Sequence, residues 1–267
     1  MNPYIRLPKV CVLRGRYDFI LERCRGKRVL HVGCVDSGQL AERFRRGELI
    51  HQRLAVSAGE LWGVDIDAEG ISFLRDNGFE NLIVGDASEI DQIEVLTKRD
   101  FDIVLASEII EHLQNPGQFL RNIRAVMRPN RTELIATVPN AHRIDTLFWL
   151  LRGIEYVHPD HNYWFSYQTA TNLLGKSGLK VEEVYVYSFR PHRIIPDFVK
   201  GILTKGDQSH EPPPGRPAKL PEASLSGIPL VREGLRYIGS FPVRVLLSLL
   251  YRRTAFFGDG IILVAKV

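Results

Sequence analysis

A short stretch near the middle of the chain places three side chains that bind protons or metals directly after an apolar run. Residues 101–107 read FDIVLAS and are followed by Glu108, Glu111 and His112. If these residues form a helical turn, positions i, i+3 and i+4 share one face, so two carboxylates and an imidazole converge. Such a group can accept a proton from a substrate or hold a divalent metal ion. The stretch is therefore a candidate reaction centre.

Glycine and aspartate residues follow the three apolar runs that precede this stretch. The first run, RVLHVG, ends at Gly33, and with Gly38 it forms a turn in which a ligand can approach the backbone. The second run, LWGVDID, contains Asp65, and the third, NLIVGDA, ends in Asp86 and Ala87. Each aspartate could cap a helix. Taken together, these strand-end residues suit a nucleoside, with Asp65 accepting hydrogen bonds from ribose hydroxyls.

Two common phosphate-binding patterns are absent from the first turn. The spacing of Gly33 and Gly38 matches the start of a P-loop, but Gln39 and Leu40 stand where its lysine and its serine or threonine belong. The dinucleotide pattern G-x-G-x-x-G is not satisfied either. A P-loop is thereby excluded.

Apolar runs alternate with helical patterns along most of the chain. The strand-like runs are 28–33, 61–67, 81–87, 101–107, 132–140, 180–189 and 260–267. One helical segment, 116–129, has a proline in its first turn and another at its end, as helices favour. Strands that alternate with helices predict a parallel sheet covered on both faces. Ligands bind such sheets at the carboxyl ends of the strands, where the candidate residues lie.

Composition indicates an ordinary globular protein. The chain has 267 residues, 45% hydrophobic and 25% charged, and its net charge of +4 is too small to imply nucleic acid. Residues 1–28 hold eight basic side chains against Asp18 and Glu22, which predicts a solvated basic helix or, alternatively, an anionic partner. The three cysteines lack paired spacing, and no apolar run approaches the roughly 20 residues of a membrane span. We expect a cytoplasmic location.

The order and spacing of these runs resemble the class I S-adenosylmethionine-dependent methyltransferases. VLHVGCVDSGQL resembles their first motif, LWGVDID the second, IVGDA the third, FDIVLASEIIEHLQNPGQFLRNIRAVMRPN the fourth with its helix, and ELIATVPN the fifth strand. The resemblance covers about residues 26–190 and the last strand. It implies an α/β fold with a Rossmann-like, doubly wound sheet of seven strands, mostly parallel with an antiparallel last strand, and a helical insertion before that strand.

A single methyltransferase domain over 1–267 follows from the resemblance. Its expected parts are an N-terminal helical segment (1–27), a cofactor-binding core (28–189), an insertion or lid (190–258) and the last strand (259–267). The insertion contains a Pro-rich linker and then an apolar, basic stretch. It is expected to form a packed lid beside the substrate, with a dimer contact or a membrane-surface helix as alternatives.

S-adenosyl-L-methionine is the cofactor that the resemblance implies. It assigns Gly33, Cys34 and Gly38 to the methionine part, Asp65 to the ribose, Ile66 to packing on the adenine, Asp86 and Ala87 to the adenine edge, and Ser107 and Glu108 to the floor beneath the sulfonium. Two positions depart from the family. His31 stands where an acidic residue is usual, and Val35 where a second glycine is usual. Asp36 is the carboxylate that could replace the missing acid.

The expected chemistry is methyl transfer to a hydroxyl. Holding the nucleophile, methyl carbon and sulfur in line provides much of the acceleration, and the hydroxyl must also lose its proton. His112 is the expected base, with Glu111 and His161 in the catalytic group, and a helix-capping imidazole is the alternative. EIIEH also resembles the metal-binding Glu-x-x-Glu-His of ubiquinone-pathway and small-RNA 2′-O-methyltransferases. The metal hypothesis places Mg²⁺ or Mn²⁺ on Glu108, Glu111, His112 and His161, with His158 a further candidate.

The acceptor is expected to be a small molecule that contains a carbohydrate. Residues 141–168 carry five aromatic side chains that can stack on a ring, namely Trp149, Tyr156, Tyr163, Trp164 and Phe165. The segment resembles H-x-x-W-F-S stretches of methyltransferases from bacterial glycan and natural-product pathways. Two alternatives stay open. One is an RNA 2′-O-methyltransferase, although the chain has no recognisable RNA-binding module. The other is a non-catalytic cofactor-binding protein, suggested by His31 and Val35.

Overall fold

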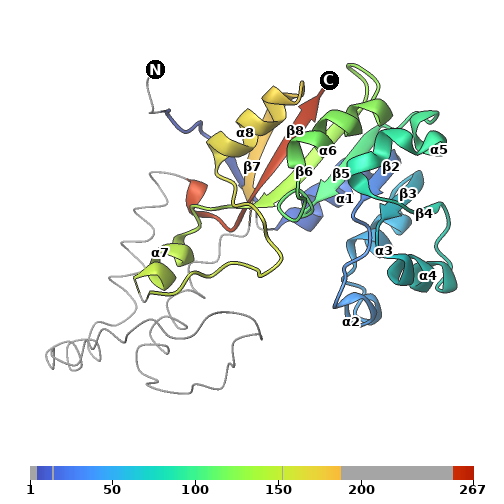
Figure 1. Cartoon of the computed structure of the whole chain (residues 1–267), viewed down its shortest axis with the longest axis horizontal. Coiled ribbons are helices and arrows are strands. Elements are labelled where there is room, and N and C mark those ends of the chain that lie inside the picture. Colours follow the sequence, from blue (N-terminus) through green and yellow to red (C-terminus); the bar gives the residue numbers. More distant parts are fainter. Residues whose placement is uncertain (1–4, 14, 152, 188–254) are drawn as a thin grey trace, which may run out of the picture. The chain divides into compact units, whose positions relative to one another are not determined.

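A computed structural model describes residues 5–13, 15–151, 153–187 and 255–267 (Figure 1). Most of the predicted insertion at 190–258, with its lid, dimer and membrane alternatives, lies outside these residues. The described strands are β1 (Cys11–Leu13), β2 (Arg28–Val32), β3 (Glu60–Asp65), β4 (Leu82–Val84), β5 (Ile103–Ser107), β6 (Glu133–Pro139), β7 (Lys180–Tyr187) and β8 (Gly260–Lys266).

The strands form one doubly wound sheet. Their order is β1-β7-β8-β6-β5-β2-β3-β4, and every pairing is parallel except the two that β8 makes. This confirms the predicted α/β fold with an antiparallel last strand. The chain proceeds outward from β2 to β4 on one side and from β5 to β6 on the other, so the order reverses between β2 and β5. Open sheets of this kind bind ligands at such a reversal, at the carboxyl ends of the strands.

Helices cover both faces of the sheet (Figure 1). They are α1 (Arg16–Cys24), α2 (Leu40–Arg45), α3 (Ile50–Ser57), α4 (Ala68–Asp76), α5 (Glu94–Thr97), α6 (Pro116–Asn122), α7 (Ile144–Leu150) and α8 (Tyr167–Lys176), with short 3₁₀ helices η1 (Ala87–Gln92), η2 (Ile123–Val126) and η3 (Ala255–Phe257). Phe119 of α6 and Leu174 of α8 are buried on one face, and Ile20 of α1 and Leu54 of α3 on the other. Burial on two faces explains why the strands read as continuous apolar runs.

The sheet has one strand more than the seven predicted. The N-terminal segment 1–27 was expected to be helical, but it contains β1 before α1. Cys11 of β1 pairs with Tyr185 of β7 in parallel register, and the helix begins only after Gly15. A three-residue strand carries too little periodic pattern to be recognised in a sequence. Its place covers the edge that β7 would otherwise present.

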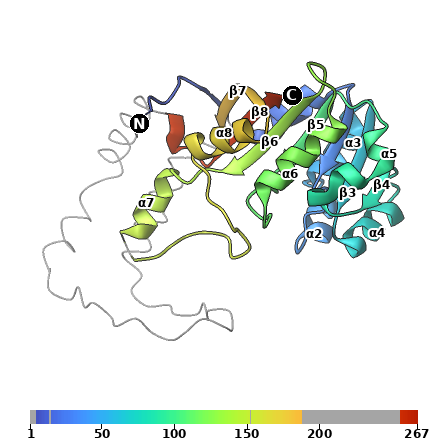
Figure 2. The ribbon, with the colours of Figure 1, turned by 45° about the horizontal axis from the view of Figure 1, so that its top comes forward.

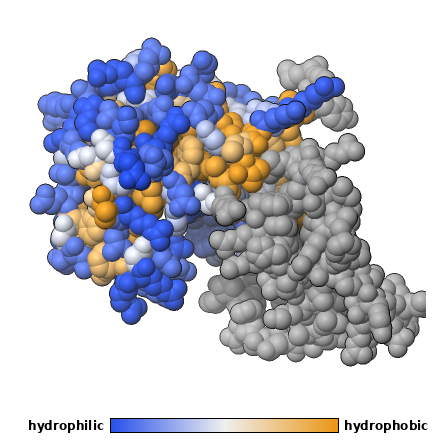
Figure 3. Space-filling model, turned by 180° about the vertical axis from the view of Figure 1, so that it is seen from behind, coloured by the Kyte–Doolittle hydropathy of each residue, from blue (hydrophilic) through white to orange (hydrophobic). Residues whose placement is uncertain are grey.

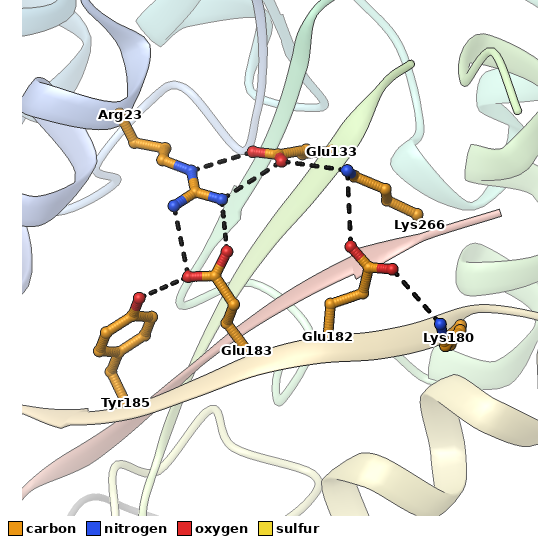
Figure 4. Close-up of polar contacts among 7 residues, drawn as sticks. All are labelled: Arg23, Glu133, Lys180, Glu182, Glu183, Tyr185 and Lys266. Carbon is orange, nitrogen blue, oxygen red and sulfur yellow. Dashed lines mark hydrogen bonds and ion pairs between the residues drawn. The ribbon is translucent and has the colours of Figure 1, made fainter. Parts of the chain in front are cut away.

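Ion pairs at the amino end of the sheet fasten α1 to the strands beneath it. Arg23, near the end of α1, bonds both carboxylate oxygens of Glu133 at 3.0 and 3.2 Å and those of Glu183 at 2.6 and 3.3 Å (Figure 4). Lys266 lies 3.5 Å from Glu133 and from Glu182. These bonds fix the position of α1 relative to β6 and β7 at the end of the sheet opposite the candidate site.

A long excursion between β6 and β7 returns to the carboxyl end of the sheet. It contains α7, a loop and α8, and Figure 2 shows the loop running back past the turn that precedes α6. Its base is closed by Asn140, whose buried amide donates to the carbonyl oxygens of Phe256 at 2.7 Å and Gly258 at 2.8 Å. The excursion carries His158 and His161.

Most of the described surface on the face shown in Figure 3 is hydrophilic, with apolar side chains gathered in a smaller area. Among the described residues, no helix combines the length and the apolar character needed to cross a membrane.

Candidate functional site

The turn after β2 meets the turn after β5. Gly33 has a φ of 73° and Gly38 a φ of 85°, which glycine adopts without strain. A β-carbon placed on Gly33 would lie 2.9 Å from Cδ1 of Ile109, so the Ile109 side chain packs directly on this glycine. The predicted glycine turn and the predicted reaction centre are therefore in contact at the point where the strand order reverses.

Asp65 ends β3 and organises the same turn. Its carboxylate accepts hydrogen bonds from the backbone N–H of Val35 at 2.8 Å and of Asp67 at 3.0 Å. Burial raises the pKa of Asp65, and the hydrogen bonds from Asp67 and Val35 oppose this rise. The next residue, Ile66, is 71% exposed and leaves an apolar side chain free to pack on a ring. Both residues lie at the carboxyl end of β3, and their contacts with ribose and adenine stay predictions.

The other predicted cofactor residues differ in whether their side chains are exposed and free to contact a ligand. Asp86 is exposed after β4, and it accepts a hydrogen bond from Ser88 N–H at 2.7 Å. The side chains of Cys34 and Ala87 are buried, so only their main-chain atoms can face a ligand. Asp36 forms an ion pair with Arg43, which occupies the carboxylate expected to replace the missing acid.

Val35, one of the two departures from the family pattern, is accommodated by a glycine elsewhere. A β-carbon on Gly70 of α4 would lie 2.3 Å from Cγ1 of Val35. Because Gly70 has no side chain, α4 leaves the space that the side chain of Val35 fills. The turn itself keeps its two glycines with a left-handed backbone, Gly33 and Gly38.

His31, the other departure, belongs to a buried pair rather than to the ligand face. Its Nδ1 lies 3.2 Å from Nδ1 of His51 in α3, so one imidazole donates and the other accepts. Neither Nε2 has a hydrogen-bond partner among the described residues. Burial lowers the pKa of His51 to about 4 and that of His31 well below 6.5, the latter also because His51 is adjacent. Both rings are therefore neutral at pH 7.

Acid should destabilise the fold through this pair. Below pH 6.5 the unfolded chain binds a proton on His51 that the folded chain binds only near pH 4, so stability is complete above 6.5 and decreases as the pH falls. We expect this one group to remove about 2 kcal/mol of unfolding free energy between pH 7 and pH 5. Urea unfolding of His51→Leu should show a shallower pH dependence, whereas His142→Leu, at an exposed histidine, should match the wild type. Equal slopes for His51→Leu and the wild type would contradict this.

The turn after β5 is not helical, which corrects the expected arrangement. Glu108 has a φ of 54°, and residues 110–112 form a turn, so Glu108, Glu111 and His112 do not share a helical face. A left-handed backbone costs a residue other than glycine about 1–3 kcal/mol and persists only where the surroundings hold it. Here the N–H of Glu108 donates to the carbonyl and the hydroxyl of Thr137 at 3.0 and 3.1 Å.

The Glu108 carboxylate faces a network of donors. Arg16 lies 2.9 Å from its Oε2, and the hydroxyls of Tyr187 and Thr137 donate to its Oε1 at 2.8 and 3.0 Å. Ser107, predicted to line the floor with Glu108, lies 3.2 Å from the Thr137 hydroxyl. Glu108 is therefore already partnered within the protein.

Glu111 is in the opposite situation. Its side chain is fully buried, and neither carboxylate oxygen has a hydrogen-bond partner among the described residues. Burial and the nearby negative charge of Glu108 raise the pKa of Glu111 to about 9. The acid is therefore protonated at pH 7. The two carboxylates of this turn thus differ in their surroundings, because only Glu108 has cationic and hydroxyl partners.

Three imidazoles meet beside this turn. A ring nitrogen of His112, one of His158 and one of His161 lie within 4.8 Å of one another. Main-chain bonds bring the two segments together: the N–H of Asn162 donates to the Glu111 carbonyl at 2.8 Å, and its side-chain amide donates to the His112 carbonyl at 2.7 Å. Burial lowers the pKa of His112 and of His161, and neighbouring imidazoles add to this effect. Neutral rings are the forms that accept protons or bind metals.

The donors brought together differ from the predicted metal set. His112 and His161 are joined by His158, while the carboxylates of Glu108 and Glu111 are not part of this group. Three imidazoles fit a metal such as Zn²⁺, whereas Mg²⁺ prefers oxygen ligands. Nδ1 of His161 is buried without a hydrogen-bond partner among the described residues, which is consistent with a nitrogen available to a ligand.

The predicted aromatic surface is largely paired with itself. Trp149 stacks on Tyr156 with ring centroids 5.5 Å apart, and Tyr163 on Phe165 at 6.1 Å. Phe165 is buried in the core and cannot contact an acceptor. Tyr156 and Tyr163 are the exposed members, at 52% and 40%.

Sequence reasoning missed the partners of Glu108. Arg16 was counted only as one of several basic residues near the N-terminus, and neither Thr137 nor Tyr187 was considered. Thr137 lies near the end of β6, and Tyr187 is the last residue of β7. Because these strands end at the same edge of the sheet as β5, both residues could have been recognised as candidates. Nothing in the local sequence around Arg16 indicates its contact.

Comparison with known proteins identifies the family. A family model described as a methyltransferase domain matches residues 9–184. Ubiquinone biosynthesis O-methyltransferases are similar, that of Bordetella parapertussis at 27% identity over 134 residues (49% of this chain, 50% of the relative) and that of Rhodopseudomonas palustris at 30% over 132 residues (49% and 47%). The chain thus spans about half the length of the curated relatives it matches.

Solved structures agree on the fold. A SAM-dependent methyltransferase from Archaeoglobus fulgidus has a TM-score of 0.51 at 18% identity and covers 94% of this chain and 91% of its own. One from Mesorhizobium loti has a TM-score of 0.50 at 12% identity, covering 94% and 96%. With the strand order, the strand-end residues and a family model that matches most of the chain, the protein belongs to the class I S-adenosylmethionine-dependent methyltransferase family.

Proposed function

We propose that this chain transfers the methyl group of S-adenosylmethionine to a hydroxyl of a small molecule, at the group formed by His112, His158 and His161. The observation that carries the proposal is that His112 lies on the turn whose Ile109 contacts Gly33 and is grouped there with His158 and His161 of the excursion. The names of the curated relatives, which are O-methyltransferases, support oxygen as the acceptor atom. Gly33, Asp65, Ile66 and Asp86 would contact the cofactor.

His112 is the proposed general base. The lowered pKa keeps its imidazole neutral at pH 7, so it can accept the proton of the hydroxyl as the oxygen attacks the methyl carbon. The carbon–sulfur bond breaks as the oxygen–carbon bond forms, and S-adenosylhomocysteine leaves. Because the pKa of His112 lies below 6.5, turnover should decline only on the acid side of that value.

The proposed acceptor is a sugar or a glycosylated metabolite. The exposed rings of Tyr156 and Tyr163 belong to the same excursion as His158 and His161. A sugar ring that stacks on one of them would lie on the segment that carries two of the three histidines. Assays with labelled S-adenosylmethionine and a panel of free sugars, glycosides, phenols and catechols test this class. Methylation of phenols alone would overturn the carbohydrate assignment.

A metal-assisted reaction is the second candidate, favoured by the three-histidine group. His112, His158 and His161 would hold the ion. A bound divalent metal would lower the pKa of a coordinated hydroxyl and so replace the base.

Chelation separates the two candidates. With His112 as the base, turnover after EDTA treatment should equal that of untreated enzyme, and His158→Ala should retain most of it. Loss of turnover with EDTA, recovered with Zn²⁺ or Mn²⁺, would show that the metal candidate is correct and the base assignment wrong. A loss that no metal restores would indicate damage by the treatment, so the same preparation must keep its S-adenosylhomocysteine affinity.

A further inference from the structure

Helix α1 is fastened to the sheet by an arginine at each end. Arg23, near its last turn, is bonded to Glu133 and Glu183 at the amino end of the strands (Figure 4). Arg16, its first residue, is paired with Glu108 at the carboxyl end, at 2.9 Å. The side chains are similarly exposed, at 22% for Arg16 and 29% for Arg23. Only the Arg16 end reaches the candidate site.

Every side-chain hydrogen bond to the Glu108 carboxylate comes from a donor that is itself held in place. Arg16 donates to the Tyr187 hydroxyl at 3.3 Å, and that hydroxyl donates to Glu108 at 2.8 Å. Thr137 donates its hydroxyl proton to Glu108 and in turn accepts from the Glu108 N–H. Three elements far apart in the sequence, α1, β6 and β7, thus hold one side chain. Charge-assisted bonds of this kind are the strong ones.

The position of Glu108 determines the position of the turn that follows. Glu108 has the left-handed backbone that bends the chain out of β5. The next residue, Ile109, packs on Gly33, and its carbonyl accepts from the N–H of His112 at 3.0 Å. A rotation at Glu108 would therefore move Ile109 against the glycine turn and His112 against the other histidines.

We propose that Arg16 is a positioning residue for methyl transfer: through its pair with Glu108 it holds the turn that carries His112 in register with the glycine turn. Arg16 does not touch the reacting atoms. The catalytic consequence rests on the proposed function, while the effect on the turn does not. Displacement of a catalytic group by about 1 Å can cost on the order of 10²-fold in rate.

Arg16→Met and Arg23→Met form a matched pair of variants on one helix. Arg16→Met should lower kcat by about 10–100-fold, with KM for the acceptor and affinity for S-adenosylhomocysteine within about twofold. Arg23→Met should lower the thermal midpoint but keep kcat. The same decrease in kcat for both variants, or an unchanged kcat in Arg16→Met, would overturn the proposal.

A double-variant cycle tests whether Arg16 acts through Glu108. In a Glu108→Gln background, Arg16→Met should change kcat by less than about twofold, because the pair is already broken. Fully additive effects would mean that Arg16 acts independently. If Arg16→Met does not fold, Tyr187→Phe removes only the intervening hydroxyl and should lower kcat by about threefold to tenfold. Wild-type kcat in Tyr187→Phe would then count against the proposal.

A readout without turnover separates this inference from the proposed function. In NMR spectra of the histidine rings, Arg16→Met should shift the signals of His112 and leave those of the buried His31 and His51 in place. A shifted His112 signal in a protein whose wild type methylates no member of the acceptor panel would support the positioning role and reject the proposed function. An unmoved His112 signal would reject the positioning role whatever the activity.

Discussion

Replacing His112 with alanine should lower turnover by about 10²–10⁴-fold, the range expected for loss of a general base. The imidazole lies on the turn after β5, its pKa is lowered by burial and by His158, and it is grouped with two further histidines. Ile109 of the same turn contacts Gly33, which places His112 three residues from the glycine turn in sequence. Initial rates at saturating acceptor and cofactor would measure the loss.

Two controls make the result specific. His142→Ala, at an exposed histidine that follows the carboxyl end of β6, should keep wild-type turnover. Affinity of His112→Ala for S-adenosylhomocysteine should stay within about twofold, because a general base contributes to the transition state rather than to cofactor binding. Wild-type turnover in His112→Ala would reject both the base and the metal candidates and leave the imidazole a structural role.

Replacing Asp65 with alanine should weaken S-adenosylhomocysteine binding by about 1–3 kcal/mol, or roughly 5- to 150-fold, the usual cost of leaving hydrogen-bonding groups unpaired. Asp65 stands at the carboxyl end of β3 with free acceptor capacity beside its two backbone bonds. The ribose hydroxyls would lose their acceptor in the variant. Titration calorimetry on the folded variant would measure the change.

Asp67→Ala is the matched control for this prediction. Asp67 is a neighbouring carboxylate that caps α4 through the N–H of Gly70 at 2.9 Å and bonds the Ser37 hydroxyl at 3.0 Å. Its loss should reduce stability by about 1 kcal/mol and leave cofactor affinity nearly unchanged. If both variants bind equally weakly, the integrity of the turn determines affinity and Asp65 has no special role.

The strand ends were predictable because the relevant signals are local. Continuous apolar runs ending in Gly33, Asp65 and Asp86 predict parallel strands, and parallel strands bring their carboxyl ends to one edge. The structure places these residues there. The strand β1 was missed because three residues show no usable period.

The turn after β5 was not predictable from its own residues. Helical spacing suggested one face for Glu108, Glu111 and His112, but Glu108 takes a left-handed backbone. Its side chain bonds Arg16 and Tyr187, 92 and 79 residues away in sequence. The same holds for His158, which reaches the group because Asn162 is bonded to the backbone of Glu111 and His112. Tertiary contacts, and not local propensity, decided the geometry of the candidate site.

A crystal structure with S-adenosylhomocysteine soaked in would test the central claim most directly. We predict the ribose on Asp65, the adenine against Ile66 beside Asp86, and the sulfur facing the histidine group at the carboxyl end of β5. The claim would be contradicted by a sulfur that faces away from His112, or by a crystal that takes up no S-adenosylhomocysteine at concentrations that saturate other members of the family.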